Sequence, residues 1–83
     1  MTDLTNLPPG RRVEMYVSPA CPYCADARAH FDARGYPYVV YDAQNDGAHR
    51  AAMLRITNGD PTVPAILVDG AYVQSGWGSP PRG

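Results

Sequence analysis

The sequence predicts a small α/β fold with a four-stranded mixed sheet, in the order β-α-β-α-β-β. Two observations support this prediction. Short β-branched and aromatic runs alternate with segments of helical periodicity, and only two residues separate the last two runs. Strands joined through helices run parallel, whereas a two-residue turn joins antiparallel neighbours. The 83 residues are expected to form one domain, with a leader at 1–11 and an irregular tail at 76–83.

The first strand is expected at residues 13–17, where valine and methionine alternate with more polar side chains. This alternation predicts a half-exposed strand or one near an edge of the sheet. A helix should begin at Pro22, because the first helical position needs no N–H donor, and Gly35 should end it. Residues 38–41 are β-branched and aromatic, which is typical of a central strand.

A second helix is expected to be capped by Asn45 or Asp46 and to end at the Asn-Gly pair at 58–59. Its predicted buried side consists of Ala48, Ala52 and Ile56, with Met53 adjacent. Strands at 65–68 and 71–74 should form a hairpin, because Asp-Gly at 69–70 is a strong signal for a two-residue turn.

The charge and hydropathy of the chain exclude several classes of function. A formal charge of −1 gives no electrostatic reason to expect binding to nucleic acid or to an anionic membrane. No apolar stretch is long enough to span a bilayer, and the first residues lack the pattern of a signal peptide. A cytoplasmic location is therefore expected. In a reducing compartment, two cysteines indicate redox or metal chemistry rather than a structural disulfide.

The two cysteines lie where a loop is expected to lead into the first helix. Cys21 precedes that helix, so a thiolate there faces unpaired N–H groups and the positive end of the helix dipole. Such a thiolate can attack a disulfide, and Cys24 is close enough to resolve the mixed disulfide that forms. One alternative is half of a zinc site, for which His30 and His49 are the only other soft candidates, although neither has the spacing of a recognised finger. The other alternative is a pair of inert core thiols.

Two short motifs resemble those of the glutaredoxin family, which has the thioredoxin fold. One is Cys-Pro-Tyr-Cys at 21–24, and the other is Thr-Val-Pro at 62–64, forty residues beyond the second cysteine. The similarity covers roughly residues 12–77. The resemblance implies that Pro64 is a cis proline facing the cysteines and that Val63 presents its backbone to an extended substrate. The implied substrate-binding residues are Tyr23, Thr62, Val63, Pro64, Ser75 and Gly76.

The sequence departs from the family pattern at two places around this motif pair. Glutaredoxins commonly carry Lys three residues before the first cysteine, where this chain has Ser18, and Arg50 or Arg55 could substitute for its charge. The segment Ser-Gly-Trp at 75–77 resembles the Ser-Gly-Phe of NrdH-type redoxins, which are reduced by thioredoxin reductase.

A third helix, usual in the family, is also missing after residue 78. Its absence would expose an apolar face of the sheet. Trp77 with the tail, Leu4 with Leu7 from the leader, a homodimer or a partner protein could each cover that face.

The predicted function is that of a thiol–disulfide oxidoreductase with glutathione as co-substrate and with no bound cofactor or metal. Its expected partners are disulfide-containing proteins or glutathione, together with a glutathione- or thioredoxin-reductase system. One alternative is an NrdH-like protein disulfide reductase. Another, from a different class, is a binding module or metal-cluster carrier built on a redox fold.

Overall fold

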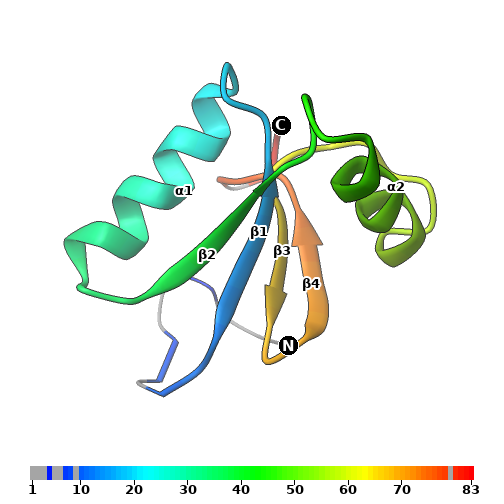
Figure 1. Ribbon diagram of the computed structural model, residues 1–83. Helices are drawn as coiled ribbons and strands as arrows, with labels where there is room; N and C mark the ends of the chain where they lie inside the picture. Colours follow the sequence, from blue (N-terminus) through cyan, green and yellow to red (C-terminus); the bar gives the residue numbers. More distant parts are fainter. Residues whose placement is uncertain (1–3, 5–6, 9, 79) are drawn as a thin grey trace.

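The computed structural model describes residues 4, 7–8, 10–78 and 80–83. It contains the six predicted elements in the predicted order (Figure 1). They are β1 (Val13–Val17), α1 (Pro22–Ala33), β2 (Tyr38–Asp42), α2 (Gly47–Ile56), β3 (Ala65–Val68) and β4 (Ala71–Ser75). The fold is therefore a minimal thioredoxin fold, as predicted. Among the described residues, no helix is long and apolar enough to cross a membrane.

The four strands form one sheet in the order β2-β1-β3-β4. β1 is parallel to β2 and antiparallel to β3, so the strand predicted near an edge is central. The strand predicted to be central, β2, is an edge strand with Val39 48% and Val40 39% exposed. The edge position of β1 and the central position of β2 were wrong because composition reports which residues favour strands, whereas strand order depends on pairing between distant segments. The alternation predicted along β1 is confirmed, since its buried residues alternate with half-buried ones.

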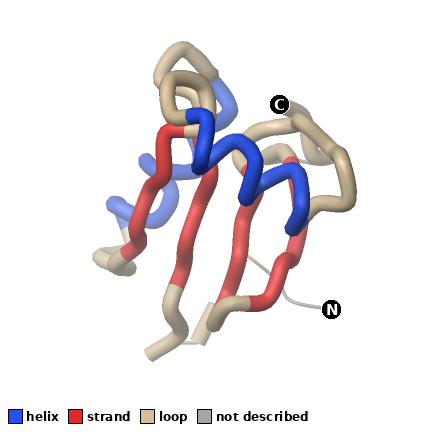
Figure 2. Tube along the Cα trace, turned by 45° about the vertical axis from the view of Figure 1, so that its right-hand side comes forward, coloured by secondary structure: helices blue, strands red, loops and turns tan. Residues whose placement is uncertain are grey.

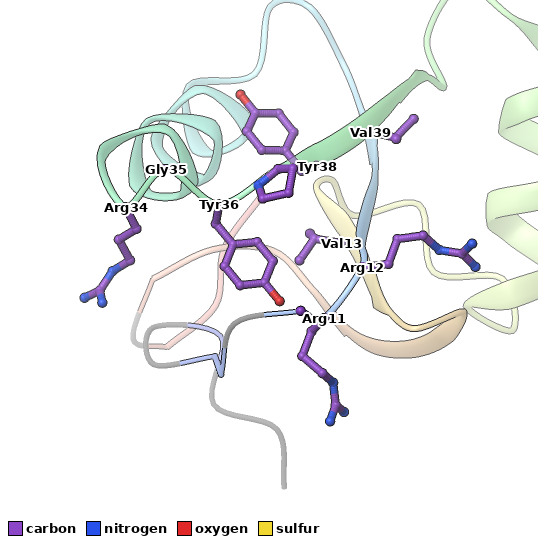
Figure 3. Close-up of a pocket in the computed structure, with 10 residues that line it drawn as sticks. Arg11, Arg12, Val13, Arg34, Gly35, Tyr36, Tyr38 and Val39 are labelled. Carbon is purple, nitrogen blue, oxygen red and sulfur yellow. The ribbon is translucent and has the colours of Figure 1, made fainter.

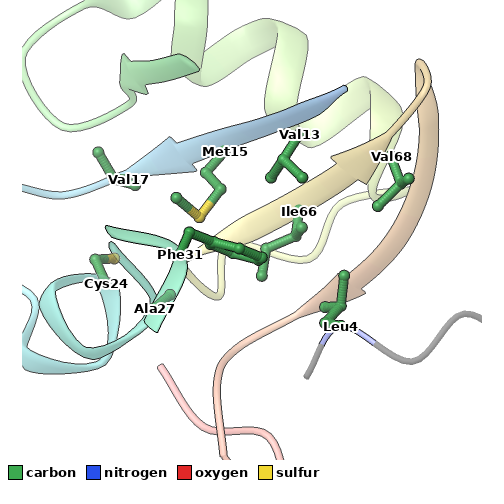
Figure 4. Packing of buried hydrophobic residues seen from close by; sticks show 9 residues of the cluster. All are labelled: Leu4, Val13, Met15, Val17, Cys24, Ala27, Phe31, Ile66 and Val68. Carbon is green, nitrogen blue, oxygen red and sulfur yellow. The ribbon is translucent and has the colours of Figure 1, made fainter. Parts of the chain in front are cut away.

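The two helices lie on opposite faces of the sheet (Figures 1 and 2). On the α1 face, Phe31 packs with Met15 and Ile66 in the main core, which Figure 4 shows at close range. On the other face, Met53 of α2 packs with Ala65 in a smaller cluster. The alternation of side chains along β1 and β3 is what allows each strand to contribute to both layers.

The second helix buries a different side from the one predicted. Asp46 caps it, as expected, and accepts hydrogen bonds from two backbone N–H groups. Met53 is its one fully buried residue, whereas Ala48 is exposed and Ile56 only half-buried. The prediction was wrong because α2 contacts the sheet through His49, whose ring lies near Tyr41, and through Met53 one turn later, so Ala48 stays in solvent.

The hairpin between β3 and β4 forms as predicted. Its two turn residues, Asp69 and Gly70, have φ angles of 52° and 82°, which fit the left-handed turn that two-residue hairpins favour. Beyond β4 the described residues form no helix. Trp77 instead pairs with Arg82 in an antiparallel bridge, so the tail folds back on itself.

The apolar face beside α1 is covered from within the chain. Leu4 is only 5% exposed and belongs to the main core, against which Leu7 and Trp77 also pack. The Trp77 ring lies 5.7 Å from that of Phe31 and 5.3 Å from that of His30, centre to centre. Trp77 is thus a core side chain, as one prediction had it. Residues 1–3, 5–6 and 9 of the leader lie outside the described residues. The homodimer remains a prediction, and this covered face gives no reason to expect it.

Candidate active site

Cys21 is the N-cap residue of α1, at the point where the loop after β1 turns into the helix. Its backbone is extended, at φ −88° and ψ 115°, and its Sγ accepts a hydrogen bond from the Cys24 N–H at 3.3 Å. Pro22 occupies the first helical position, which needs no donor. This local geometry is the one that the spacing predicted, with a sulfur at the positive end of a helix dipole.

Cys24 lies one turn further along α1 and differs from Cys21 in its surroundings. Both are free thiols, but Cys24 is 2% exposed whereas Cys21 is half-buried. Burial, together with the side-chain hydrogen bond to Cys21, raises the pKa of Cys24 from 9.0 to about 12. Cys24 therefore remains a protonated thiol at neutral pH, and Cys21 is the sulfur that an incoming disulfide can reach.

The backbone of the loop before β3 lies beside Cys21. The Val63–Pro64 peptide bond is cis, as the resemblance implied. The Val63 carbonyl oxygen lies 3.7 Å from the Cys21 Sγ and accepts a hydrogen bond from it. Pro64 in turn accepts a hydrogen bond from the Gly76 N–H at 2.8 Å. The structure thus brings together the cysteine motif, the Thr-Val-Pro loop and the start of the tail.

Asp60 shapes this loop, although the sequence reasoning did not single it out. Its carboxylate accepts a hydrogen bond from the Thr62 N–H at 2.9 Å, and the Thr62 hydrogen bonds lower the pKa of Asp60. Its backbone carbonyl accepts a hydrogen bond from the Thr57 hydroxyl at 2.8 Å. The signal available in the sequence was an Asp two residues before Thr62, the spacing of an Asx turn.

A small cavity of about 150 Å³ lies next to Val63, which forms part of its lining. Its lining residues are Ser18, Ala43, Gln44, Arg50, Met53, Pro61 and Val63. Ser18 donates a hydrogen bond to the Gln44 side chain. Arg50 is the one basic lining residue, and Arg55 is not among the residues that line this cavity. Arg50 is therefore the candidate for the charge that Ser18 does not supply.

Two predicted substrate-binding residues have less direct evidence. Tyr23 lies half-buried in the first turn of α1, between the cysteines. Ser75 ends β4 opposite Ala65, and its hydroxyl is hydrogen-bonded to the Tyr72 hydroxyl at 2.6 Å. The Ser75 hydroxyl is thus already engaged, which leaves the backbone of 75–76 as the part of this segment nearest to the loop.

The two histidines lie away from the cysteines. His30 packs against Trp77 and Phe31, and burial lowers its pKa. His49 stacks near Tyr41 on the other face of the sheet and lies 3.4 Å from a carboxylate oxygen of Asp46. In the described part of the chain, no three His, Cys, Asp or Glu side chains come together as a metal site would need.

A larger cavity, of about 410 Å³, lies at the opposite end of the sheet. The residues at the end of α1, the start of β2 and the start of β1 line it, and no cysteine does (Figure 3). The guanidinium groups of Arg11, Arg12 and Arg34 point away from one another around it. Of the two cavities, only the smaller one includes Val63, whose carbonyl oxygen contacts the Cys21 thiol.

Comparison with known proteins agrees with this geometry. The glutaredoxin family model matches residues 13–73, a stretch that includes both cysteines and the Thr-Val-Pro loop. Glutaredoxin 3 of Escherichia coli K12 is 31% identical over 61 residues, covering 74% of this chain and 72% of that protein.

Two solved structures show the same fold. Oxidised glutaredoxin 2 of Chlamydomonas reinhardtii is 29% identical with a TM-score of 0.60, over 78% of this chain and 64% of that one. The buckwheat glutaredoxin–glutathione complex is 24% identical with a TM-score of 0.66, over 87% and 64%.

Proposed function

Because the chain belongs to the glutaredoxin family of thiol–disulfide oxidoreductases, we propose that Cys21 attacks substrate disulfides, that Cys24 resolves the intermediate and that glutathione is the co-substrate. The observation that carries this assignment is the contrast between the two thiols. Cys21 caps the helix beside the Val63 backbone, whereas Cys24 is buried with its pKa raised to about 12.

The reaction proceeds in two exchanges. The Cys21 thiolate attacks one sulfur of the substrate disulfide, forming a new S–S bond while the old one breaks and its other sulfur leaves as a thiolate. Cys24 then gives up its proton and attacks Cys21, which releases the second substrate sulfur and leaves a Cys21–Cys24 disulfide. Two electrons have passed to the substrate. Two glutathione molecules return them, and oxidised glutathione is released.

An extended substrate is held by two features of the site. The Thr62-Val63 backbone offers an edge with which a peptide-like segment can pair as an added strand. Glutathione is a tripeptide with carboxylates at both ends, so with its sulfur at Cys21 one carboxylate can reach the Arg50 cavity. The guanidinium supplies a charge-assisted hydrogen bond there. That the buckwheat glutaredoxin of the same fold was solved with glutathione supports this co-substrate.

A coupled assay tests the proposal. Reduced protein with glutathione, glutathione reductase and a small disulfide should consume NADPH, and Cys21→Ser should abolish this turnover. Retained turnover in Cys21→Ser would show that another group is the nucleophile. A cytoplasmic location belongs to the same proposal, because the dithiol form needs a reducing compartment.

A second candidate is an NrdH-like protein disulfide reductase fed by thioredoxin reductase. The observation that favours it is the Ser-Gly-Trp segment at 75–77, which begins at the last residue of β4 and contacts the loop through the hydrogen bond from Gly76 to Pro64. Running the assay in parallel with thioredoxin reductase distinguishes the two donors. NADPH consumption with thioredoxin reductase alone would replace glutathione as the co-substrate and leave the roles of Cys21 and Cys24 intact.

A further inference from the structure

The tail of the chain folds back toward the redox site. After β4, Trp77 and Arg82 pair through two backbone hydrogen bonds, from the Trp77 N–H at 2.7 Å and from the Arg82 N–H at 2.9 Å. This bridge directs residues 80–83, hereafter the strap, along the loop that precedes β3. In Figures 1 and 2 the end of the chain lies at the end of the sheet where β1 finishes and β3 begins.

The strap passes over Gly76 at very short range. Gly76 is buried with φ +90°, and a Cβ atom there would lie 2.8 Å from the Arg82 nitrogen and 3.0 Å from its carbonyl group. Only a residue without a side chain leaves room for the strap backbone at this position. Because Gly76 also donates its N–H to the Pro64 carbonyl, the strap is held close to the Thr-Val-Pro loop.

Gly83, at the far end of the strap, lies on the substrate-binding edge itself. A Cβ atom at this position would overlap the Val63 carbonyl oxygen and lie 2.6 Å from the Thr62 Cγ2. The same Val63 oxygen accepts the hydrogen bond from the Cys21 thiol. Gly83 thus contacts a backbone group next to the reactive sulfur, on the edge where an extended substrate would pair.

We propose that the strap occupies the Thr62-Val63 edge, with which an extended substrate would pair, and thereby determines which disulfides react readily with Cys21. Glutathione and peptide disulfides, which need the Thr62-Val63 edge, must first displace it. A disulfide without amide groups needs only the sulfur and does not compete with it. This inference rests on the proposed function, since it concerns access to the same thiol.

The strap is held weakly enough to be displaced. All of its residues are exposed, and the only backbone hydrogen bonds that the described residues show for it are the two of the Trp77–Arg82 bridge. Exposed hydrogen bonds of this kind change an equilibrium by about 2- to 10-fold each. Because apparent affinity falls with the fraction of molecules in which the Thr62-Val63 edge is free, removing the strap and both hydrogen bonds should raise reactivity by about 4- to 100-fold.

The experiment compares two disulfides with pre-reduced protein, in the absence of free glutathione. Oxidised glutathione carries peptide groups, whereas bis(2-hydroxyethyl) disulfide carries none. The second-order rate constant of Cys21 is measured with each by rapid quenching and mass spectrometry. The variants are a chain lacking residues 80–83 and Arg82→Pro, which removes the N–H that closes the bridge. Arg82→Ala is the matched control, because it removes the same charge and keeps the N–H.

The expected result is selective. With oxidised glutathione the shortened chain, which lacks both hydrogen bonds, should react about 4- to 100-fold faster, and Arg82→Pro, which lacks one, about 2- to 10-fold faster. Both should stay within about twofold of the parent with bis(2-hydroxyethyl) disulfide. Arg82→Ala should stay within twofold of the parent with both. An equal rise with both disulfides, or no rise with either, would overturn the proposal. If the parent reacted with neither disulfide, the proposed function would fail as well, which is a distinguishable outcome.

Discussion

Replacing Arg50 by Gln tests whether its guanidinium binds a glutathione carboxylate. The variant keeps a polar side chain of similar length and removes one positive charge from the cavity that Ser18 and Gln44 also line. Arg55→Gln is the matched control, because it removes the same charge from the same helix without touching that cavity.

The expected magnitude follows from the position of Arg50. Two unit charges about 4 Å apart interact with about 1 kcal/mol in bulk water and about 4 kcal/mol at a partly screened protein surface. Arg50 is exposed, so the lower figure applies, and a loss of about 1 kcal/mol raises KM about 5-fold. The kcat should be nearly unchanged, because a carboxylate bound equally in the ground and transition states does not alter the chemical step.

The assay is NADPH oxidation coupled to glutathione reductase, with the glutathione concentration varied. Arg50→Gln should show the 5-fold rise in KM at low salt and a smaller rise at about 0.5 M salt, where exposed charges are screened. Arg55→Gln should stay within 1.5-fold or so of the parent. An equal rise in both variants, or a fall in kcat with KM unchanged in Arg50→Gln, would refute the reasoning.

Four further predictions concern the thiols, the core and the loop. Because the pKa of Cys24 is raised to about 12, iodoacetamide at neutral pH should label only Cys21 in the native reduced protein, and double labelling on peptide mapping would contradict this. The same shift implies that the contribution of Cys24 to the free energy of unfolding is fully present below pH 9 and falls as the pH rises from 9 toward 12, because the unfolded chain loses this proton first. Denaturant titrations should show this fall for the parent and not for Cys24→Ala. Trp77→Ala removes a half-buried ring that packs against the core. It should lower the free energy of unfolding by about 2 kcal/mol, or the Tm by about 8–16 °C for a domain of this size. A calorimetric shift of less than a few degrees would argue against the role of Trp77 in covering the core. Asp60→Ala should lower kcat/KM by loosening the Thr62 turn, while Asp60→Asn, which retains an acceptor oxygen, should largely preserve it; equal losses would show that the charge rather than the hydrogen bond matters.

The elements were predictable wherever one short stretch of chain decides the structure. Pro22 at the first position of α1, Asp46 at the cap of α2 and the turn residues Asp69 and Gly70 act through their own backbone and their nearest neighbours. Signals of this kind are readable without knowing what lies across the sheet. The order of elements, and with it the fold class, followed from them.

The order of strands and the buried side of α2 were not predictable in the same way. β2 is rich in valine and tyrosine, yet it lies at an edge, because β1 pairs with both β2 and β3. Met53 rather than Ala48 is buried because the side of α2 that meets the sheet carries His49 and Met53. Both outcomes depend on contacts between segments far apart in the sequence, which local patterns do not encode.

The same distinction between local and long-range causes applies to the candidate active site. The sequence by itself determined the chemistry at Cys21 and Cys24, since a three-residue spacing across a helix start sets which thiol caps the helix and which is buried behind it. Only the tertiary structure decided what surrounds that chemistry. In the folded chain Arg50 rather than Arg55 lines the cavity, and Gly83 of the strap lies against the Val63 carbonyl. The physical reason is that a helix start is a local structure, whereas a groove is formed by segments that meet only after folding.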